Sequence, residues 1–226
     1  MIKACIFDLD GTIADTIETI TYYANRALNK FGYGNITSDR YKFLVGNGYE
    51  ILVKNMLNEL DVYDDKVYNE MKEFYHDDYE TDSLYKTTIY DGINELMEFL
   101  SKNGIKKGVI TNKPQGAAED VLKHFFKDGT FEYISGVSEG TTLKPDSMRL
   151  NKMLDDMGVS KDEILYFGDT KTDMETAKNG DVFAVGVLWG FRPEKELTDN
   201  GADMIIKHPK EIIDFICDKN NIKKDL

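Results

Sequence analysis

The chain has 226 residues and a formal net charge of −13 at pH 7, from 28 Lys or Arg and 41 Asp or Glu residues. Such an acidic chain is a poor partner for nucleic acid or an anionic membrane surface, because both would repel it. No apolar run approaches the roughly 18 residues of a membrane-spanning helix, and acidic residues interrupt the apolar N-terminal run too early for a signal peptide. We therefore expect a cytoplasmic protein of one or two domains that does not contact membranes.

The cysteines and histidines limit the kinds of site that the chain can build. Cys5 and Cys217 lie in apolar segments at opposite ends of the chain, which predicts buried free thiols and no disulfide. The three histidines, His76, His124 and His208, show no metal-ligand spacing. A zinc site is therefore not expected.

The first fifteen residues, MIKACIFDLDGTIAD, contain the most informative pattern. Residues 2–7 are nearly all apolar, as in a strand that is buried on both faces of a parallel sheet. Asp8 and Asp10 follow, and because alternate side chains of an extended chain share a face, their carboxylates should point the same way. Two like charges about 4 Å apart repel by roughly 4 kcal/mol at an effective dielectric constant of about 20. A simple Asp-Gly turn is one interpretation, but the repulsion favours a cation at the end of this strand.

The next segment, residues 15–87, is predicted to be an all-helical cap. Asp15 and Glu18 have the spacing of a capping box, with Asp15 as the N-cap of the first helix. No convincing strand pattern occurs over residues 13–86, and residues 81–91 are the best candidate for the hinge that returns the chain. Apolar residues recur at helical spacing in three stretches, residues 17–31, 49–60 and 65–79.

From Tyr90 onward, strand patterns alternate with helix patterns. The alternation indicates crossover connections, and hence a doubly wound parallel sheet with helices on both faces. We therefore predict an α/β core formed by residues 1–14 and 88–226, with ligands at the carboxyl ends of its strands. The later strands are predicted at residues 107–111, 133–137, 164–167 and 182–187, and the helices at residues 93–102, 115–126, 147–157, 172–178 and from Pro209 onward.

Two of the later segments place phosphate-binding candidates near strand ends. Thr111 and Asn112 end one predicted strand, where a hydroxyl and a backbone N–H can both donate to a phosphate oxygen. A threonine at a strand end is common, so this position alone is weak evidence. Lys144 precedes Pro145, which stiffens the loop and so favours a fixed ammonium over a solvated one.

Two further carboxylates complete a candidate metal site. Asp169 stands at the end of the strand predicted at residues 164–167, and Asp173 falls in the first turn of the next helix. A carboxylate is favourable at that helix end whatever its function. Asp8 and Asp169 have no histidine beside them in the sequence. Together they would form a site of hard oxygen ligands, which is the kind that suits Mg²⁺.

The chain resembles the haloacid dehalogenase-like hydrolases, a superfamily in which phosphatases predominate. The resemblance rests on residues 8–12 (DLDGT), on Thr111, on Lys144 and on residues 167–173 (FGDTKTD), in the order of the family's four motifs. The helical insertion after the first strand is similar to the cap of one large branch of the superfamily. The resemblance therefore implies the same fold for nearly the whole chain.

The resemblance also implies a role for each candidate residue. Asp8 would attack phosphorus to give an aspartyl-phosphate. Asp10 would protonate the leaving oxygen, then activate the water that hydrolyses the intermediate. The implied metal ligands are Asp8, the backbone carbonyl of Asp10, and Asp169, supported by Asp173; the implied phosphoryl-binding groups are Thr111, the Asn112 backbone and Lys144.

The sequence also bears on which member of the superfamily this is. Val45–Gly48, Gly168–Asn179 and Gly186–Arg192 resemble phosphoglycolate phosphatases and their close relatives. Residues 15–18 resemble a segment of β-phosphoglucomutases, but those enzymes carry a histidine where this chain has Ile20. A phospho-accepting receiver-type protein is the non-enzyme alternative, although such proteins are shorter and order their motifs differently. We predict a Mg²⁺-dependent phosphatase, monomeric or homodimeric, that acts on a small phosphorylated metabolite resembling phosphoglycolate.

Overall fold

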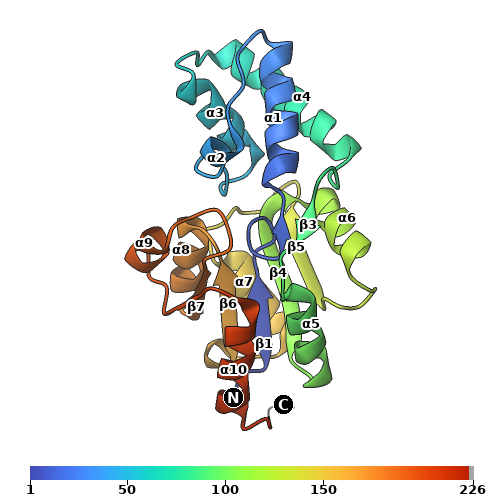
Figure 1. The fold of residues 1–226 in the computed structure, drawn as a ribbon, viewed down its shortest axis with the longest axis vertical. Helices are drawn as coiled ribbons and strands as arrows, with labels where there is room; N and C mark the ends of the chain where they lie inside the picture. The colour runs from blue at the N-terminus through green and yellow to red at the C-terminus, as the bar shows by residue number, and fades with distance from the viewer. Residues whose placement is uncertain (224–226) are drawn as a thin grey trace.

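The computed structural model describes residues 1–223, and a six-stranded sheet is its central feature (Figure 1). In spatial order the strands are β5 (Tyr133–Val137), β4 (Lys106–Pro114), β1 (Ala4–Phe7), β6 (Ile164–Gly168), β7 (Phe183–Val187) and β8 (Met204–Ile206). Each strand is parallel to its neighbours. Because β1 lies between β4 and β6, the residues that follow it are at the centre of the carboxyl edge.

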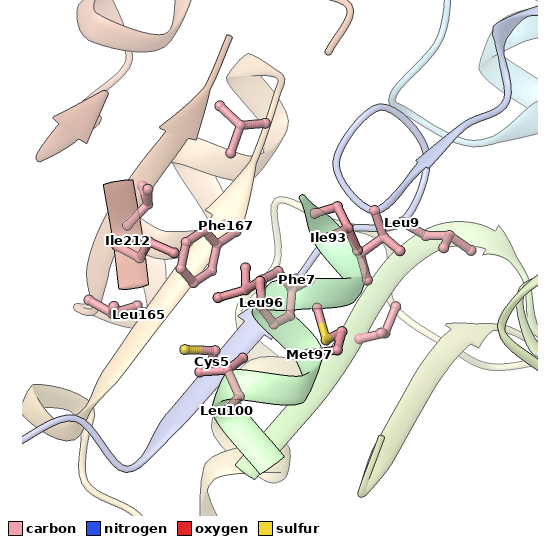
Figure 2. Packing of buried hydrophobic residues seen from close by; sticks show 14 of the residues in the cluster. Cys5, Phe7, Leu9, Ile93, Leu96, Met97, Leu100, Leu165, Phe167 and Ile212 are labelled. Carbon is pink, nitrogen blue, oxygen red and sulfur yellow. The ribbon is translucent and has the colours of Figure 1, made fainter. Parts of the chain in front are cut away.

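Helices cover both faces of the sheet. One face is covered by α5 (Ile93–Lys102), α6 (Gln115–Phe125) and α10 (Pro209–Asn220), and the other by α7 (Met148–Met157), α8 (Lys171–Gly180) and α9 (Glu194–Asp199). Figure 2 shows Phe7 of β1 beside Leu96 of α5, and Phe167 of β6 beside Ile212 of α10. Ala4 and Ile6 point to the opposite cluster. Burial on both faces explains the unbroken apolar run of β1, and the predicted doubly wound fold is confirmed.

The helical insertion forms a separate unit beyond the carboxyl edge of the sheet (Figure 1, blue to green). It has its own apolar core, in which Leu28, Tyr41, Met56 and Met71 are fully buried. Its helices are α1 (Ile17–Lys30), α2 (Ser38–Tyr41), α3 (Tyr49–Glu59) and α4 (Asp65–Thr81). The all-helical cap was predicted, whereas its boundaries at residues 15 and 87 stay a prediction.

A two-stranded antiparallel ribbon connects the two units. β2 (Ala14–Asp15) pairs with β3 (Thr88–Ile89), with Ala14 opposite Ile89. The expectation of no strand over residues 13–86 is therefore wrong at β2. Two residues give no readable periodicity, and this strand exists because the outgoing and returning connections run side by side and bond each other's backbone.

The predicted capping box at the start of α1 is also wrong. Thr16 is the N-cap residue, and Asp15 Oδ1 accepts a hydrogen bond from the Ile17 N–H at 3.3 Å. Glu18 does not turn back to the backbone, since its Oε1 accepts from the Ser38 hydroxyl at 2.7 Å. The carboxylate of Glu18 therefore accepts a hydrogen bond from a side chain of α2 and not from the backbone at the start of its own helix.

Other segments of the described chain refine the sequence predictions. Cys5 and Cys217 are both buried and free, as expected. β4 is longer than predicted and continues through the motif residues Thr111 and Asn112 to Pro114. Within residues 1–223 no helix is both long and apolar enough to cross a membrane. The short elements α2, α9, β8 and the 3₁₀ helix Lys161–Glu163 were not predicted, because each spans fewer than two helical turns or four strand residues.

Candidate active site

The carboxyl ends of the three central strands bring the predicted site residues together. Asp8 follows β1, Thr111 lies near the end of β4, and Asp169 follows β6. These strands are neighbours in the sheet, so residues more than one hundred positions apart in the sequence meet at one edge. The cap lies over this edge (Figure 1), and a cavity of about 70 Å³ separates the two units.

Three buried carboxylates and one buried ammonium form the centre of the site. Oxygen atoms of Asp8, Asp169 and Asp173 lie within 4.8 Å of one another. Lys144 Nζ lies 2.8 Å from Asp8 Oδ1 and 2.7 Å from Asp173 Oδ1. The cation expected at the end of the first strand is thus present. One ammonium leaves two of the three negative charges in this cluster uncompensated.

Burial and mutual repulsion alter how these groups hold protons. Burial raises the pKa of Asp8 to about 7, with Lys144 opposing the shift and Asp173 adding to it. Burial, and then the charges of Asp173 and Asp8, raise the pKa of Asp169. Burial disfavours the charged form of Lys144, but Asp173 and Asp8 outweigh it and the pKa of Lys144 is raised. A bound cation would favour the ionised carboxylates.

The contacts of each carboxylate separate possible metal ligands from supporting groups. Asp173 uses both oxygens, because Oδ1 accepts from Lys144 and Oδ2 accepts from the Thr170 N–H at 3.1 Å and hydroxyl at 2.7 Å. Asp169 Oδ2 accepts from the Phe191 N–H at 2.7 Å, while its Oδ1 has only a 3.4 Å contact with Thr12. The oxygen donors present fit Mg²⁺ best through Asp8 and Asp169, with Asp173 holding Lys144 in place.

Close backbone approach around Asp169 requires glycine. Gly11 has a φ of +85°, and a Cβ at this position would clash with the Asp169 carboxylate. A Cβ at Gly190 would clash with the same side chain and with the Gly11 carbonyl. The two glycines therefore let the loop after β1 and the loop after β7 close around Asp169.

The side chain of Asn112 has a structural role beside the one predicted for its backbone. Its Oδ1 accepts from the backbone N–H of Lys144 at 2.8 Å, and its Nδ2 donates to the carbonyl of Lys144 at 3.2 Å. The side chain thus fixes the loop that carries Lys144. The predicted phosphate donor is the backbone N–H of Asn112, and that role stays a prediction. Thr111 Oγ1 accepts from the Lys113 N–H at 3.2 Å, which leaves its own proton for a ligand.

Two cationic residues of this site were not predicted. Arg149 is buried and donates to the Thr111, Ser135 and Gly136 carbonyls and to Asn112 Oδ1, at 2.9 to 3.2 Å. Lys113 Nζ lies 3.0 Å from Asp10 Oδ1 and 2.5 Å from the Tyr79 hydroxyl of the cap. Most Lys and Arg residues are exposed, and a single sequence gives no sign that these two are buried.

The loop at residues 45–48 of the cap contacts the core, and it is one of the stretches singled out in the sequence. The other two stretches supply partners for it. The hydrogen bonds run from Arg192 Nη2 to the Val45 carbonyl at 2.9 Å, from Asn112 Nδ2 to the Gly46 carbonyl at 3.2 Å and from the Thr172 hydroxyl to Asn47 Oδ1 at 2.8 Å. The structure therefore has the cap closed over the strand ends.

The cavity has walls of two kinds. Core residues Asp8, Asp10, Thr111 and Lys113 supply polar groups, and the cap supplies mainly aromatic and aliphatic ones, including Ile20, Tyr49, Leu52, Tyr75 and Tyr79. The small volume favours a small ligand. A cluster of carboxylates with one ammonium, under a largely apolar cover, is an arrangement that suits phosphoryl transfer.

Comparisons with known proteins agree with this geometry. The family model described as haloacid dehalogenase-like hydrolase matches residues 5–187. A phosphoglycolate phosphatase of Rhodospirillum rubrum is 34% identical over 202 residues, which are 86% of this chain and 83% of that protein. A phosphoglycolate phosphatase of Vibrio parahaemolyticus is 24% identical over 223 residues, with 96% of each chain covered.

Solved structures show the same fold. A crystal structure from Lactobacillus delbrueckii subsp. bulgaricus, of a protein provisionally described as a phosphoglycolate phosphatase, has a TM-score of 0.87 and 27% identity. It covers 95% of this chain and 98% of that one. The β-phosphoglucomutase of Clostridium difficile has a TM-score of 0.77 with 98% of both chains covered. Its identity is 22%, so this second likeness concerns the fold alone.

Proposed function

We propose that this chain, which belongs to the haloacid dehalogenase-like hydrolase family, is a Mg²⁺-dependent phosphatase that hydrolyses a small phosphate monoester similar to phosphoglycolate. The observation that carries the proposal is the buried Lys144 ammonium between Asp8 and Asp173, with Asp169 beside them. Asp8 of this cluster lines the cavity beneath the cap, and the ammonium beside it offsets the repulsion that the acidic chain would exert on a phosphate dianion.

Asp8 and Asp10 are proposed to carry out the reaction in two steps. In the first, a carboxylate oxygen of Asp8 attacks phosphorus, the bond from phosphorus to the ester oxygen breaks, and Asp10 gives that oxygen a proton. In the second, a water molecule attacks the phosphorus of the aspartyl-phosphate and gives its proton to Asp10. The Asp8 carboxylate and inorganic phosphate are then released, which restores the enzyme.

The other residues of the site hold the reacting groups. Lys144 neutralises Asp8 and the incoming phosphate, and Thr111 offers a free hydroxyl proton to a phosphoryl oxygen. Mg²⁺, held by Asp8, Asp169 and the Asp10 carbonyl, would supply further positive charge to the phosphoryl group. The closed cap keeps bulk water out of the cavity during the first step.

Hydrolysis is preferred over mutase chemistry because of Ile20. This side chain of α1 lies in the cavity wall, where a β-phosphoglucomutase would be expected to have a histidine. An aliphatic side chain cannot hydrogen-bond a sugar phosphate or exchange a proton with it. Receiver-type signalling is set aside, because the family is one of hydrolases.

Phosphate release from a set of small monoesters with Mg²⁺ present tests the proposal. We expect inorganic phosphate in an amount equal to the ester consumed, and no release when EDTA removes the metal. Phosphorus NMR with β-glucose 1-phosphate separates the alternatives, since a dominant glucose 6-phosphate signal would indicate a mutase. Full activity in EDTA would contradict the proposed metal dependence.

A further inference from the structure

Lys113 is a buried lysine on the wall of the cavity, at the side where a leaving group would lie. It follows Thr111 and Asn112 at the end of β4, and its side chain is only 3% exposed. Asp10, the proposed acid for the leaving oxygen, is 3.0 Å from its Nζ. Among the residues described as lining this cavity, Lys113 is the only Lys or Arg.

The hydrogen bonds of Lys113 are incomplete. An ammonium has three N–H donors. Two contact protein groups, Asp10 Oδ1 at 3.0 Å and the Tyr79 hydroxyl at 2.5 Å. No third acceptor contacts Nζ within residues 1–223, so one N–H of a buried charge is left for a ligand in the cavity.

Tyr79 of the cap offers a second free donor beside the first. Its hydroxyl oxygen accepts from Lys113, and no acceptor in the described part of the chain takes its proton. Burial, and to a lesser extent the charge of Asp10, raise the pKa of Tyr79 well above its usual value, so the hydroxyl stays protonated. An N–H of Lys113 and the O–H of Tyr79 therefore lie close together at the cavity wall, and each lacks an acceptor within the described residues.

We propose that Lys113 and Tyr79 bind a carboxylate on the leaving group, so that the substrate is a short phosphorylated hydroxy acid. A carboxylate satisfies both free donors and compensates the buried ammonium, whereas a neutral leaving group leaves that charge with Asp10 alone. This inference rests on the proposed phosphatase function and adds to it the chemical group and the residues that select the substrate.

The geometry also limits the distance between the carboxylate and the ester oxygen. Asp10 must approach the ester oxygen to about 3 Å to protonate it, and Lys113 Nζ lies 3.0 Å from Asp10. A group bound to Lys113 therefore lies within a few carbon atoms of the ester oxygen. The small cavity favours a short acid over a long one.

A pair of esters that differ in one group tests the inference. Phosphoglycolate carries the carboxylate, and 2-hydroxyethyl phosphate has the same number of carbons with a neutral hydroxyl instead. We expect kcat/KM of the wild-type protein with Mg²⁺ to favour phosphoglycolate by about 100-fold, the effect of pairing a buried charge. Lys113→Gln should reduce the preference for phosphoglycolate to about threefold or less. Tyr79→Phe should reduce the wild-type preference by a factor of about five to ten, because one hydrogen bond to a charged group is lost.

A matched control comes from the same strand. Lys107 is also a buried lysine of β4, but its partner is Glu132 at 3.8 Å, at the opposite end of the strand. Lys107→Gln should keep the wild-type ratio, so that general damage to β4 is distinguished from loss of selection. The ratio, not the absolute rate, is the quantity compared.

Several outcomes would overturn the inference. A wild-type protein that hydrolyses both esters equally well, or p-nitrophenyl phosphate but not phosphoglycolate, would overturn it while the proposed phosphatase function stands. An unchanged ratio in Lys113→Gln would overturn the role of Lys113 in selecting the leaving group. If Lys113→Gln does not fold, the wild-type ratio alone decides. Failure to release phosphate from any monoester would overturn the proposed function itself.

Discussion

The core and the cap contribute different kinds of groups to the same cavity. The core holds its charged side chains by short contacts, such as the 2.8 Å and 2.7 Å pairs of Lys144 with Asp8 and Asp173. The cap contributes mainly aromatic and aliphatic side chains; one ribbon joins it to the core, and the loop at residues 45–48 and Tyr79 make further contacts. The difference indicates that the core determines the reaction, whereas the cap determines access and the choice of leaving group.

If the core determines the reaction, removing its nucleophile should have the largest effect. Asp8→Asn keeps the size of the side chain but cannot form the phosphoenzyme, so kcat should fall by at least about 10⁴-fold. Circular dichroism should show an unchanged fold, because Asp8 carries a charge that its burial disfavours. Wild-type turnover by this variant would contradict the role of Asp8.

Lys144→Met should have the next largest effect. It removes the ammonium that pairs with Asp8 and Asp173, so kcat/KM should fall by about 10³-fold. The metal-free variant should also lose about 3 to 5 kcal/mol of unfolding free energy, because buried carboxylates are left unpaired. Urea unfolding with EDTA measures this loss, and Lys152→Met, which removes an exposed ion pair with Asp156, is the control. Equal losses in the two variants would contradict the electrostatic account.

The raised pKa of Asp8 predicts a pH-dependent stability in the metal-free core. In the unfolded chain Asp8 ionises near its ordinary value of 3.8, but in the fold only near 7. Its stabilising contribution is therefore complete below about pH 4 and is lost as the pH rises to about 7, up to about 4 kcal/mol in all. Urea unfolding of the wild type and Asp8→Asn in EDTA measures it. A difference between the two proteins that does not change with pH would contradict the shift.

Arg149 is expected to position the phosphate site without touching substrate. It donates hydrogen bonds to the Thr111 carbonyl and to the Asn112 side chain. Asn112 in turn accepts a hydrogen bond from the backbone N–H of Lys144. Arg149→Met should lower kcat/KM by about 10- to 100-fold, which is the range for residues that orient the ligand-binding groups of a site. Binding of inorganic phosphate should weaken in parallel, which separates positioning from a general loss of stability. The control is Arg26→Met, which breaks an ion pair with Asp78 in the cap.

The smallest predicted effect concerns the loop of the cap. Asn47→Ala removes the 2.8 Å hydrogen bond from Thr172, worth about 1 kcal/mol, and should raise KM by about fivefold with little change in kcat. Hydrogen exchange at β2 and β3 should be faster than in the wild type, and a phosphate analogue should slow it in both. Identical exchange in the free and bound wild type would contradict a moving cap.

The sequence was most informative where a residue's position follows from regular structure. Asp8 and Asp169 could be placed because each ends an apolar strand, and parallel strands end at the same edge of a sheet. The fold was predicted on this basis, and the family and hydrolase class from the resemblance of the motifs; all three predictions are confirmed. The same reasoning could not place Lys113 or Arg149, because their burial depends on neighbours from other elements.

Competition between local and tertiary partners explains the errors. Glu18 has capping-box spacing, but Ser38 of α2 takes its carboxylate. β2 has only two residues and depends on β3, which is more than seventy positions away. The contacts of the Asn112 side chain with the Lys144 loop and the cap were missed for the same reason, whereas the role predicted for its backbone stays a prediction. In each case the partner is distant in the sequence, so no local pattern indicates it.

Trapping the phosphoenzyme tests the central claim most directly. Wild-type protein would be mixed with phosphoglycolate and Mg²⁺, quenched in acid within one turnover, digested and examined by mass spectrometry. We predict a phosphoryl group on the peptide that contains Asp8, which hydroxylamine removes and which Asp8→Asn lacks, together with inorganic phosphate equal to the substrate lost. Steady phosphate release with no phosphorylated peptide at any quench time, or with the group on another residue, would contradict the account.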